Sequence, residues 1–234
     1  MATTQLQAPP SATAPRRMSY AEFLAWTDED THAEWVDGEV IVFMPAKEIH
    51  QTTLGFLFRL LGMFVDLLVQ GRVQLAPFEM RLSSSRSREP DLLFVRQENL
   101  GRLTPDRLEG PADLVVEIVS DDSVQRDRRD KFKEYRAAGI PEYWIIDPRP
   151  GKLRADFYTL DEEGDYALFG TEDDEKVASR VLAGFWLRPA WLWQVETLDP
   201  FLALCEMRGL SAEQSQAIQA LLRGGPTSSE PSHA

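Results

Sequence analysis

Two different spacings of apolar residues follow one another along the chain. Between residues 49 and 69 apolar side chains recur at steps of three and four, which predicts a long amphipathic helix. Residues 91–95 and 113–119 are instead nearly continuous apolar runs, as expected for strands that are covered on both faces. Another extended segment is expected at 73–82. The pattern therefore predicts one long helix followed by three strands.

Cap and turn residues locate the elements on either side. Ser19, with Glu22 three residues later, forms a capping box that predicts a short helix through Trp26. Asp37-Gly38 lies between short extended runs and predicts a two-residue hairpin turn. Further along, we expect a helix at 123–138, a strand at 142–146, a hairpin of 153–160 with 166–169, and a helical stretch at 201–223. This order predicts an α/β fold, with a mixed central sheet flanked by helices, an N-terminal hairpin and additional C-terminal strands.

The two ends of the chain differ from its middle in composition. Residues 1–17 are rich in Ala, Thr, Gln and Pro and have no periodic apolar face, so we expect a disordered tail. A second disordered tail, rich in Gly, Pro and Ser, is expected at 225–234. Between them we predict one domain over 18–197 and a C-terminal helical extension over 198–224.

Composition narrows the class of protein. The chain has 234 residues, 43% of them hydrophobic and 27% charged, which suits one well-filled core. Cys205 is the only cysteine, which excludes an internal disulfide, argues against a thiolate metal site and fits a reducing compartment. No run approaches the roughly 20 apolar residues that span a bilayer, since 54–69 is interrupted by Arg59 and Asp66. We therefore expect a cytoplasmic protein with no membrane partner.

The net charge of −13 counts against a protein that coats nucleic acid, because such proteins carry a basic face. A catalytic protein needs only a local positive patch. Basic residues do gather at two places, 81–88 and 126–136: Arg81, Arg86, Arg88, Arg126, Arg128, Arg129, Lys131, Lys133 and Arg136. They could hold a phosphate backbone, and the alternative is ion pairing along an exposed helix.

Two carboxylates occupy apolar strands, where a charge is costly. Asp91 opens the run 91–95, and Glu117 lies inside the run 113–119. A charged group in such a place needs an ionic partner or a metal ion. Neighbouring strands lie about 4.8 Å apart, so the two carboxylates can share one Mg²⁺ if their strands pair. The alternative is structural, with Asp91 capping a turn and Glu117 paired with a buried arginine.

These carboxylates belong to an ordered series of residues that extends over about residues 18–197. The series consists of Glu34, Asp37-Gly38-Glu39, His50, Pro90-Asp91-Leu92-Leu93-Phe94-Val95, Pro111-Ala112-Asp113-Leu114-Val115-Val116-Glu117-Ile118-Val119-Ser120, Asp127, Lys131, Tyr135 and Gly139-Ile140-Pro141-Glu142-Tyr143-Trp144-Ile145-Ile146-Asp147-Pro148. It resembles the PD-(D/E)xK nuclease superfamily, and more specifically its large bacterial family of restriction-endonuclease-like proteins, the Uma-two type.

The resemblance implies a metal-dependent endonuclease that hydrolyses phosphodiester bonds of nucleic acid. DNA is the expected substrate, and Mg²⁺ is the expected cofactor, with Mn²⁺ as its substitute. Asp91 and Glu117 are implied as metal ligands, with the backbone carbonyl of Ile118 as a third. A homodimer is also suggested, because cutting both strands of a duplex often uses paired sites.

One residue departs from the superfamily pattern. The lysine expected two residues after the glutamate is replaced by Val119. Within the family the lysine looks relocated to the following helix, where Lys131 occupies the matching place and Lys133 is the second candidate. Lys131 would then orient the nucleophile or add electrostatic stabilisation.

Two further residues form a second tier of site candidates. The resemblance supports Glu39 and His50 as family-matching positions, and the alternatives are a surface glutamate and a helix-capping histidine. The alternative for the whole chain is a catalytically silent binding or regulatory protein on the same nuclease fold. A third hypothesis is a hydrolase of another phosphate ester.

Overall fold

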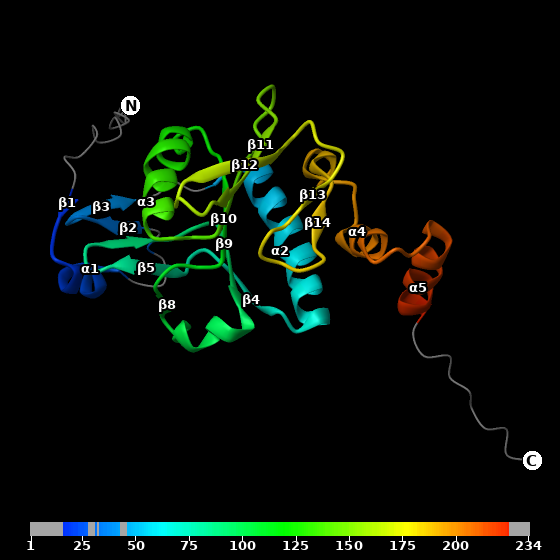
Figure 1. The fold of residues 1–234 in the computed structure, drawn as a ribbon, viewed down its shortest axis with the longest axis horizontal. Coiled ribbons are helices and arrows are strands. Elements are labelled where there is room, and N and C mark those ends of the chain that lie inside the picture. Colours follow the sequence, from blue (N-terminus) through cyan, green and yellow to red (C-terminus); the bar gives the residue numbers. More distant parts are fainter. Residues whose placement is uncertain (1–15, 28–30, 32, 43–45, 225–234) are drawn as a thin grey trace, which may run out of the picture.

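Two six-stranded sheets form the frame of the molecule in the computed structural model of this chain (Figure 1). The structure describes residues 16–27, 31, 33–42 and 46–224. The N-terminal sheet has the order β1-β3-β2-β6-β5-β8, with strands Arg16–Arg17, Glu39–Val42, Ala33–Val36, Arg86–Arg88, Glu79–Ser83 and Arg107–Glu109. The central sheet has the order β12-β11-β10-β9-β7-β4, with strands Tyr166–Thr171, Arg154–Leu160, Glu142–Asp147, Leu114–Ile118, Leu92–Arg96 and Gly71–Leu75.

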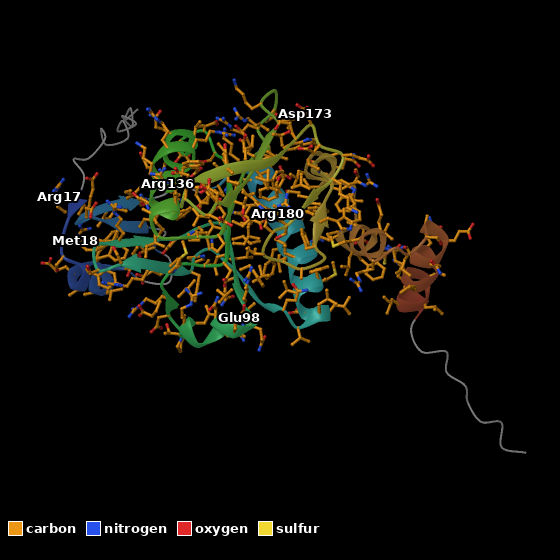
Figure 2. All side chains as sticks on the ribbon, in the orientation of Figure 1. Arg17, Met18, Glu98, Arg136, Asp173 and Arg180 are labelled. Carbon is orange, nitrogen blue, oxygen red and sulfur yellow. The ribbon has the colours of Figure 1, made fainter. Side chains whose placement is uncertain are left out.

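The helices cover the central sheet on both sides (Figure 1). On one side lies α2 (Glu48–Leu68), with the ribbon β13–β14 (Val177–Ala178, Trp186–Leu187) and α4 (Pro200–Met207) beyond it. On the other side lie a π-helix η2 (Arg126–Lys131), its continuation α3 (Phe132–Ala137) and the N-terminal sheet with α1 (Tyr20–Trp26). The remaining elements are the 3₁₀ turns η1 (Gln97–Arg102) and η3 (Pro189–Trp193) and the terminal helix α5 (Ala212–Gly224). Side chains fill the spaces between these layers (Figure 2).

The mixed central sheet predicted from the sequence is confirmed. β9 and β10 are parallel, whereas β7 pairs with β9, β4 with β7 and β10 with β11 in the antiparallel sense. The capping box of α1 is present, with the Ser19 side chain accepting from the backbone of Glu22. The β2–β3 hairpin turns at Asp37 and Gly38, which both have positive φ, as a two-residue turn of this kind requires.

One predicted strand is wrong. The segment expected at 73–82 is two strands, β4 and β5, which belong to different sheets. Pro77 lies between them and has no N–H to continue a ladder. The expected tail at 1–17 also differs at its end, because Arg16 and Arg17 pair with β3. Residues 1–15 and 225–234, the rest of the expected tails, lie outside the described residues.

Gly71 allows β4 to begin directly after α2. Val69 closes the helix in the left-handed conformation, and Gly71 follows with φ of 147°. A Cβ atom at this position would lie 2.0 Å from the Val95 carbonyl oxygen on β7. Only glycine therefore permits the close approach of the two backbones here.

Two apolar clusters lie on opposite faces of the central sheet. One joins α2 with alternate residues of the strands, such as Phe94, Val116 and Trp144. The other contains Val115, Tyr143 and their neighbours, with residues of the N-terminal sheet and α3. Among the described residues, α2 alone is long and apolar enough to cross a membrane by length and composition. Its buried side chains are part of the first cluster, as in a core helix of a globular domain.

Candidate active site

Strand pairing brings the two predicted carboxylates to one edge of the central sheet. Leu92 of β7 lies opposite Val116 of β9, so Asp91 and Glu117 occupy the next pair of positions. Asp91 Oδ2 accepts a hydrogen bond of 2.7 Å from the backbone N–H of Ile118. Asp91, Glu117 and Ile118 line one cavity of about 900 Å³. The Cβ atoms of directly opposed residues in an antiparallel pair lie about 4.5–5.5 Å apart.

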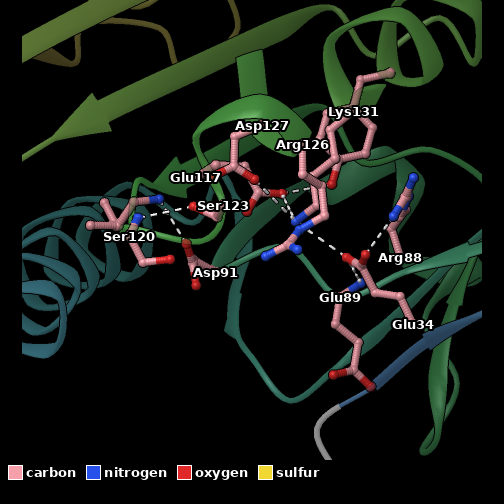
Figure 3. Close-up of polar contacts among 12 residues, drawn as sticks. Glu34, Arg88, Glu89, Asp91, Glu117, Ser120, Ser123, Arg126, Asp127 and Lys131 are labelled. Carbon is pink, nitrogen blue, oxygen red and sulfur yellow. Dashed lines mark hydrogen bonds and ion pairs between the residues drawn. The ribbon is translucent and has the colours of Figure 1, made fainter. Parts of the chain in front are cut away.

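Lys131 enters this cavity from η2 and is almost completely buried. Its Nζ lies 2.9 Å from Glu117 Oε1, 3.2 Å from Glu34 Oε1 and 3.7 Å from Asp127 Oδ1 (Figure 3). Burial alone would lower the pKa of Lys131, but the surrounding carboxylates outweigh it and raise that pKa above its ordinary value. The side chain is therefore a fixed ammonium at neutral pH. Lys133, the second candidate, is exposed and lines a different cavity.

Glu117 is a buried carboxyl with two donors on the same oxygen. Oε1 accepts from Lys131 and, at 2.7 Å, from the hydroxyl of Tyr135 on α3. Burial raises the pKa of Glu117 to about 8, helped by the charges of Asp127 and Asp91 and opposed by Lys131. Burial thus disfavours the ionised form of Glu117, and an additional positive charge beside the carboxylate stabilises that form.

Glu34 and Arg88 extend the ionic network beneath the cavity. Arg88 Nη1 donates to Glu34 at 2.5 Å and Nε donates to Glu134 at 2.7 Å, and both Glu34 and Arg88 are buried. Burial would raise the pKa of Glu34, but Lys131 and Arg88 outweigh it and bring it below its ordinary value. Glu34 therefore ties the lysine to the N-terminal sheet. The sequence resemblance included Glu34, but nothing in its position indicated its partners.

The two second-tier candidates have different positions. His50, on α2, lines the cavity, and its Nε2 lies 3.3 Å from Asp91 Oδ1. Burial would lower the pKa of His50, but Asp91 and the main chain of Ile118 raise it. Glu39, on β3, lies 3.7 Å from the Arg17 guanidinium and lines the second cavity. The structure therefore brings His50, and not Glu39, together with the carboxylates.

Asp127 and Glu89 also line the cavity. Asp127 is buried one helical step before Lys131, and its Oδ1 has no hydrogen-bond partner among the described residues. The backbone N–H of Glu89 donates to Glu34, while its carboxyl group extends away from the lysine (Figure 3). Burial raises the pKa of Glu89 to about 8, with further contributions from Glu34 and Glu79. Asp127 belongs to the series that carries the family resemblance, and Glu89 is marked in the sequence by its place beside Pro90.

The donor set suits a hard divalent cation. Among the described residues, no three Asp, Glu, His or Cys side chains are grouped as a metal site, so the candidate ligands are two carboxylates and one carbonyl. Mg²⁺ is often held by one or two carboxylates and keeps several waters. The Ile118 N–H faces Asp91, and in an extended strand the carbonyl of the same residue faces the same side. Asp91, Glu117 and the Ile118 carbonyl therefore fit such an ion.

The mixed sheet, the paired carboxylates at its edge and the lysine from the next helix define a restriction-endonuclease-like fold. Residues 20–190 match the Uma2 family, described as "Putative restriction endonuclease", and the chain belongs to this family. Its structure is similar to that of a "putative nuclease belonging to DUF820" from Anabaena variabilis, with a TM-score of 0.63 and 16% sequence identity, covering 76% of this chain and 98% of that one. A search of the curated proteins found no match.

Proposed function

We propose that this chain is a Mg²⁺-dependent endonuclease that hydrolyses phosphodiester bonds of nucleic acid, with DNA as its substrate and Mn²⁺ as a substitute ion. The proposal includes a cytoplasmic location and a homodimer, since a duplex offers two strands to cut. The observation that carries it is the meeting of Asp91, Glu117 and the Lys131 ammonium in one cavity. Membership of a family described as restriction endonucleases supports the same class of reaction.

Each residue has a defined part in this proposal. Asp91, Glu117 and the Ile118 carbonyl hold the ion, which when bound lowers the pKa of a water molecule and stabilises charge on the phosphate. The Lys131 ammonium, anchored on Glu117 and Glu34, orients the attacking water and adds positive charge where negative charge develops. Tyr135 fixes the Glu117 carboxyl through Oε1.

The test is cleavage of single- and double-stranded DNA and RNA with Mg²⁺, Mn²⁺ or EDTA. We expect cutting that requires metal and that falls about a hundredfold to a thousandfold in Glu117→Gln, the scale of a lost charge stabilisation in a transition state. Gln keeps the shape of the side chain, so the variant is expected to fold. Circular dichroism measures this as the control. If the unsubstituted chain cleaves none of these substrates, the result would instead favour a catalytically silent binding protein.

Calorimetry separates the metal ligands from the lysine. Asp91→Ala should abolish Mn²⁺ binding, whereas Lys131→Met should retain it and lose cleavage. Unchanged Mn²⁺ affinity in Asp91→Ala would make the ligand assignment wrong. Lys131 is buried between carboxylates, so the melting temperature of its variant is measured alongside, and the comparison is made well below that temperature.

A further inference from the structure

A second cavity, of about 820 Å³, lies on the other side of η2 and α3 from the carboxylates. Its walls are the β2–β3 hairpin, β6 and the two helical segments. Its basic residues are Arg86, Arg88, Arg128, Arg129, Lys133 and Arg136, against the acidic residues Glu39, Asp130 and Glu134. This groove, as we call the cavity, is locally positive on a chain whose net charge is −13.

Not all of these cations are available to a ligand. Arg88 is buried between Glu34 and Glu134, and Arg128 is paired with the buried Asp156. The side chains of Arg129 and Lys133 are exposed and form no ion pair or hydrogen bond within the part of the chain that the structure describes. They are four residues apart, so they lie on neighbouring turns of the same helical face.

Two other cations of the groove are held only by weak pairs. Arg86 contacts Asp37 and Arg136 contacts Asp165, and all four side chains are substantially exposed. Exposed pairs of this kind contribute at most about 1 kcal/mol, so an incoming anion can exchange with the carboxylates. The groove can thus present up to four cations to one anionic ligand.

The chemistry of the groove favours phosphate groups. Three of its four available cations are arginines, whose planar guanidinium groups bind phosphate through two parallel hydrogen bonds. The helical segment η2 carries Arg126 in the first cavity and Arg129 in the groove, only three residues apart. A polymer with regularly spaced phosphates can therefore contact both cavities at once, which a single small anion cannot.

We propose that the groove binds the phosphodiester backbone of the nucleic acid whose scissile bond lies in the first cavity, with Arg129 and Lys133 as its principal contacts. This inference rests on the proposed function, because it assigns the groove to the same substrate. It adds a binding surface that lies outside the cavity formed around Asp91, Glu117 and Lys131.

The experiment measures binding of a short fluorescent DNA duplex, and of the matching RNA, by anisotropy in EDTA over a range of salt concentrations. The variant is Arg129→Ala with Lys133→Ala. The charge-matched control is Arg72→Ala with Lys152→Ala, two exposed cations outside both cavities. Polyglutamate as competitor separates recognition of phosphate from simple attraction of a polyanion.

We expect the groove variant to bind DNA about tenfold more weakly and its salt slope to fall by about 1.8, the value for two lost phosphate contacts on duplex DNA. The control should keep the affinity and slope of the unsubstituted chain. Equal weakening in both variants, no binding by the unsubstituted chain, or competition by polyglutamate as strong as by unlabelled DNA would overturn the inference.

Cleavage distinguishes this failure from failure of the proposed function. If the chain cuts DNA with Mg²⁺ and the groove variant cuts equally well, the proposal for the groove is wrong and the proposed endonuclease function stands. If the unsubstituted chain binds DNA without cutting it and the groove variant loses this binding, the proposal for the groove stands and the proposed endonuclease function is wrong. If both proposals hold, the groove variant raises KM and leaves kcat within about twofold, as expected when uniform binding is lost.

Discussion

The two faces of the central sheet are covered by side chains of different character. The face against α2 is mainly apolar, with Leu60 and Phe64 packed without exposure in a continuous cluster. The face against α3 buries Glu117, Lys131 and Arg88 among its apolar residues. Burying apolar surface stabilises the fold directly, whereas each buried charge costs several kcal/mol unless its partners are in place. The first face thus supplies stability, and the second uses part of it to hold charges where a reaction needs them.

The largest effect on stability is expected from breaking the charged face. Arg88→Met leaves Glu34 and Glu134 without their guanidinium partner and should destabilise the fold by about 4 kcal/mol, the scale for a buried pair that loses one member. Arg86→Met on the same strand removes only an exposed pair with Asp37 and should cost less than about 1 kcal/mol. Urea unfolding of both variants measures the difference, and similar losses would contradict the comparison.

A somewhat smaller loss is expected on the apolar face. Leu60→Ala removes a fully buried side chain and should destabilise the fold by about 3 kcal/mol through lost burial and the cavity left behind. Leu67→Ala, on the exposed side of the same helix, should change stability by less than about 0.5 kcal/mol. Neither variant should alter cleavage per folded molecule, which is checked by the rate at a temperature where both are fully folded.

The charged face should also make stability depend on pH. The pKa of Glu117 is raised to about 8 by burial, so its contribution to stability is present at low pH and is lost as pH rises toward 8. In EDTA we expect the melting temperature to fall between about pH 5 and 8, and Glu117→Gln to fall less. Mg²⁺ should bind more tightly as pH rises, because it needs the ionised carboxyl. Parallel melting profiles of the two chains, from scanning calorimetry, would refute this account.

The smallest effect is expected at Glu39. This side chain is 40% exposed and lies away from the carboxylates, so Glu39→Gln should change Mn²⁺ affinity and the kcat of cleavage by less than about twofold. Isothermal calorimetry and a plasmid-cutting assay provide the measurements. A loss comparable to that of Asp91→Ala would instead show that Glu39 reaches the metal.

The sequence predicted the elements that carry the paired carboxylates, because those elements are marked by local patterns. The apolar runs around Asp91 and Glu117 are the strands β7 and β9, and the Asp37-Gly38 turn is the β2–β3 hairpin. The steps of three and four correspond to α2. Each of these signals depends on neighbouring residues, which a single sequence displays directly.

Features that depend on distant pairing were not predictable in this way. The second sheet joins β5 in parallel with β8, a short strand with no pattern of its own. The Glu34–Arg88 contact joins residues 54 positions apart, and the local sequence around either residue does not indicate its partner. The helix expected at 123–138 is a π-helix over Arg126–Lys131 followed by α3. Single π-helical turns are frequent at functional sites. The segment is too short for its apolar spacing to distinguish a π-helix from an α-helix.

The bond between Glu34 and Lys131 has a consequence for how relatives of this chain can change. Glu34 pairs with two cations, Arg88 from the neighbouring strand and Lys131 from η2. A neutral residue at position 34 would therefore remove an anionic partner from two buried positive charges. Substitutions at these three positions should then occur together across a lineage. A relative that has lost the lysine is expected to have replaced the glutamate as well, and such paired losses would mark members that have given up catalysis.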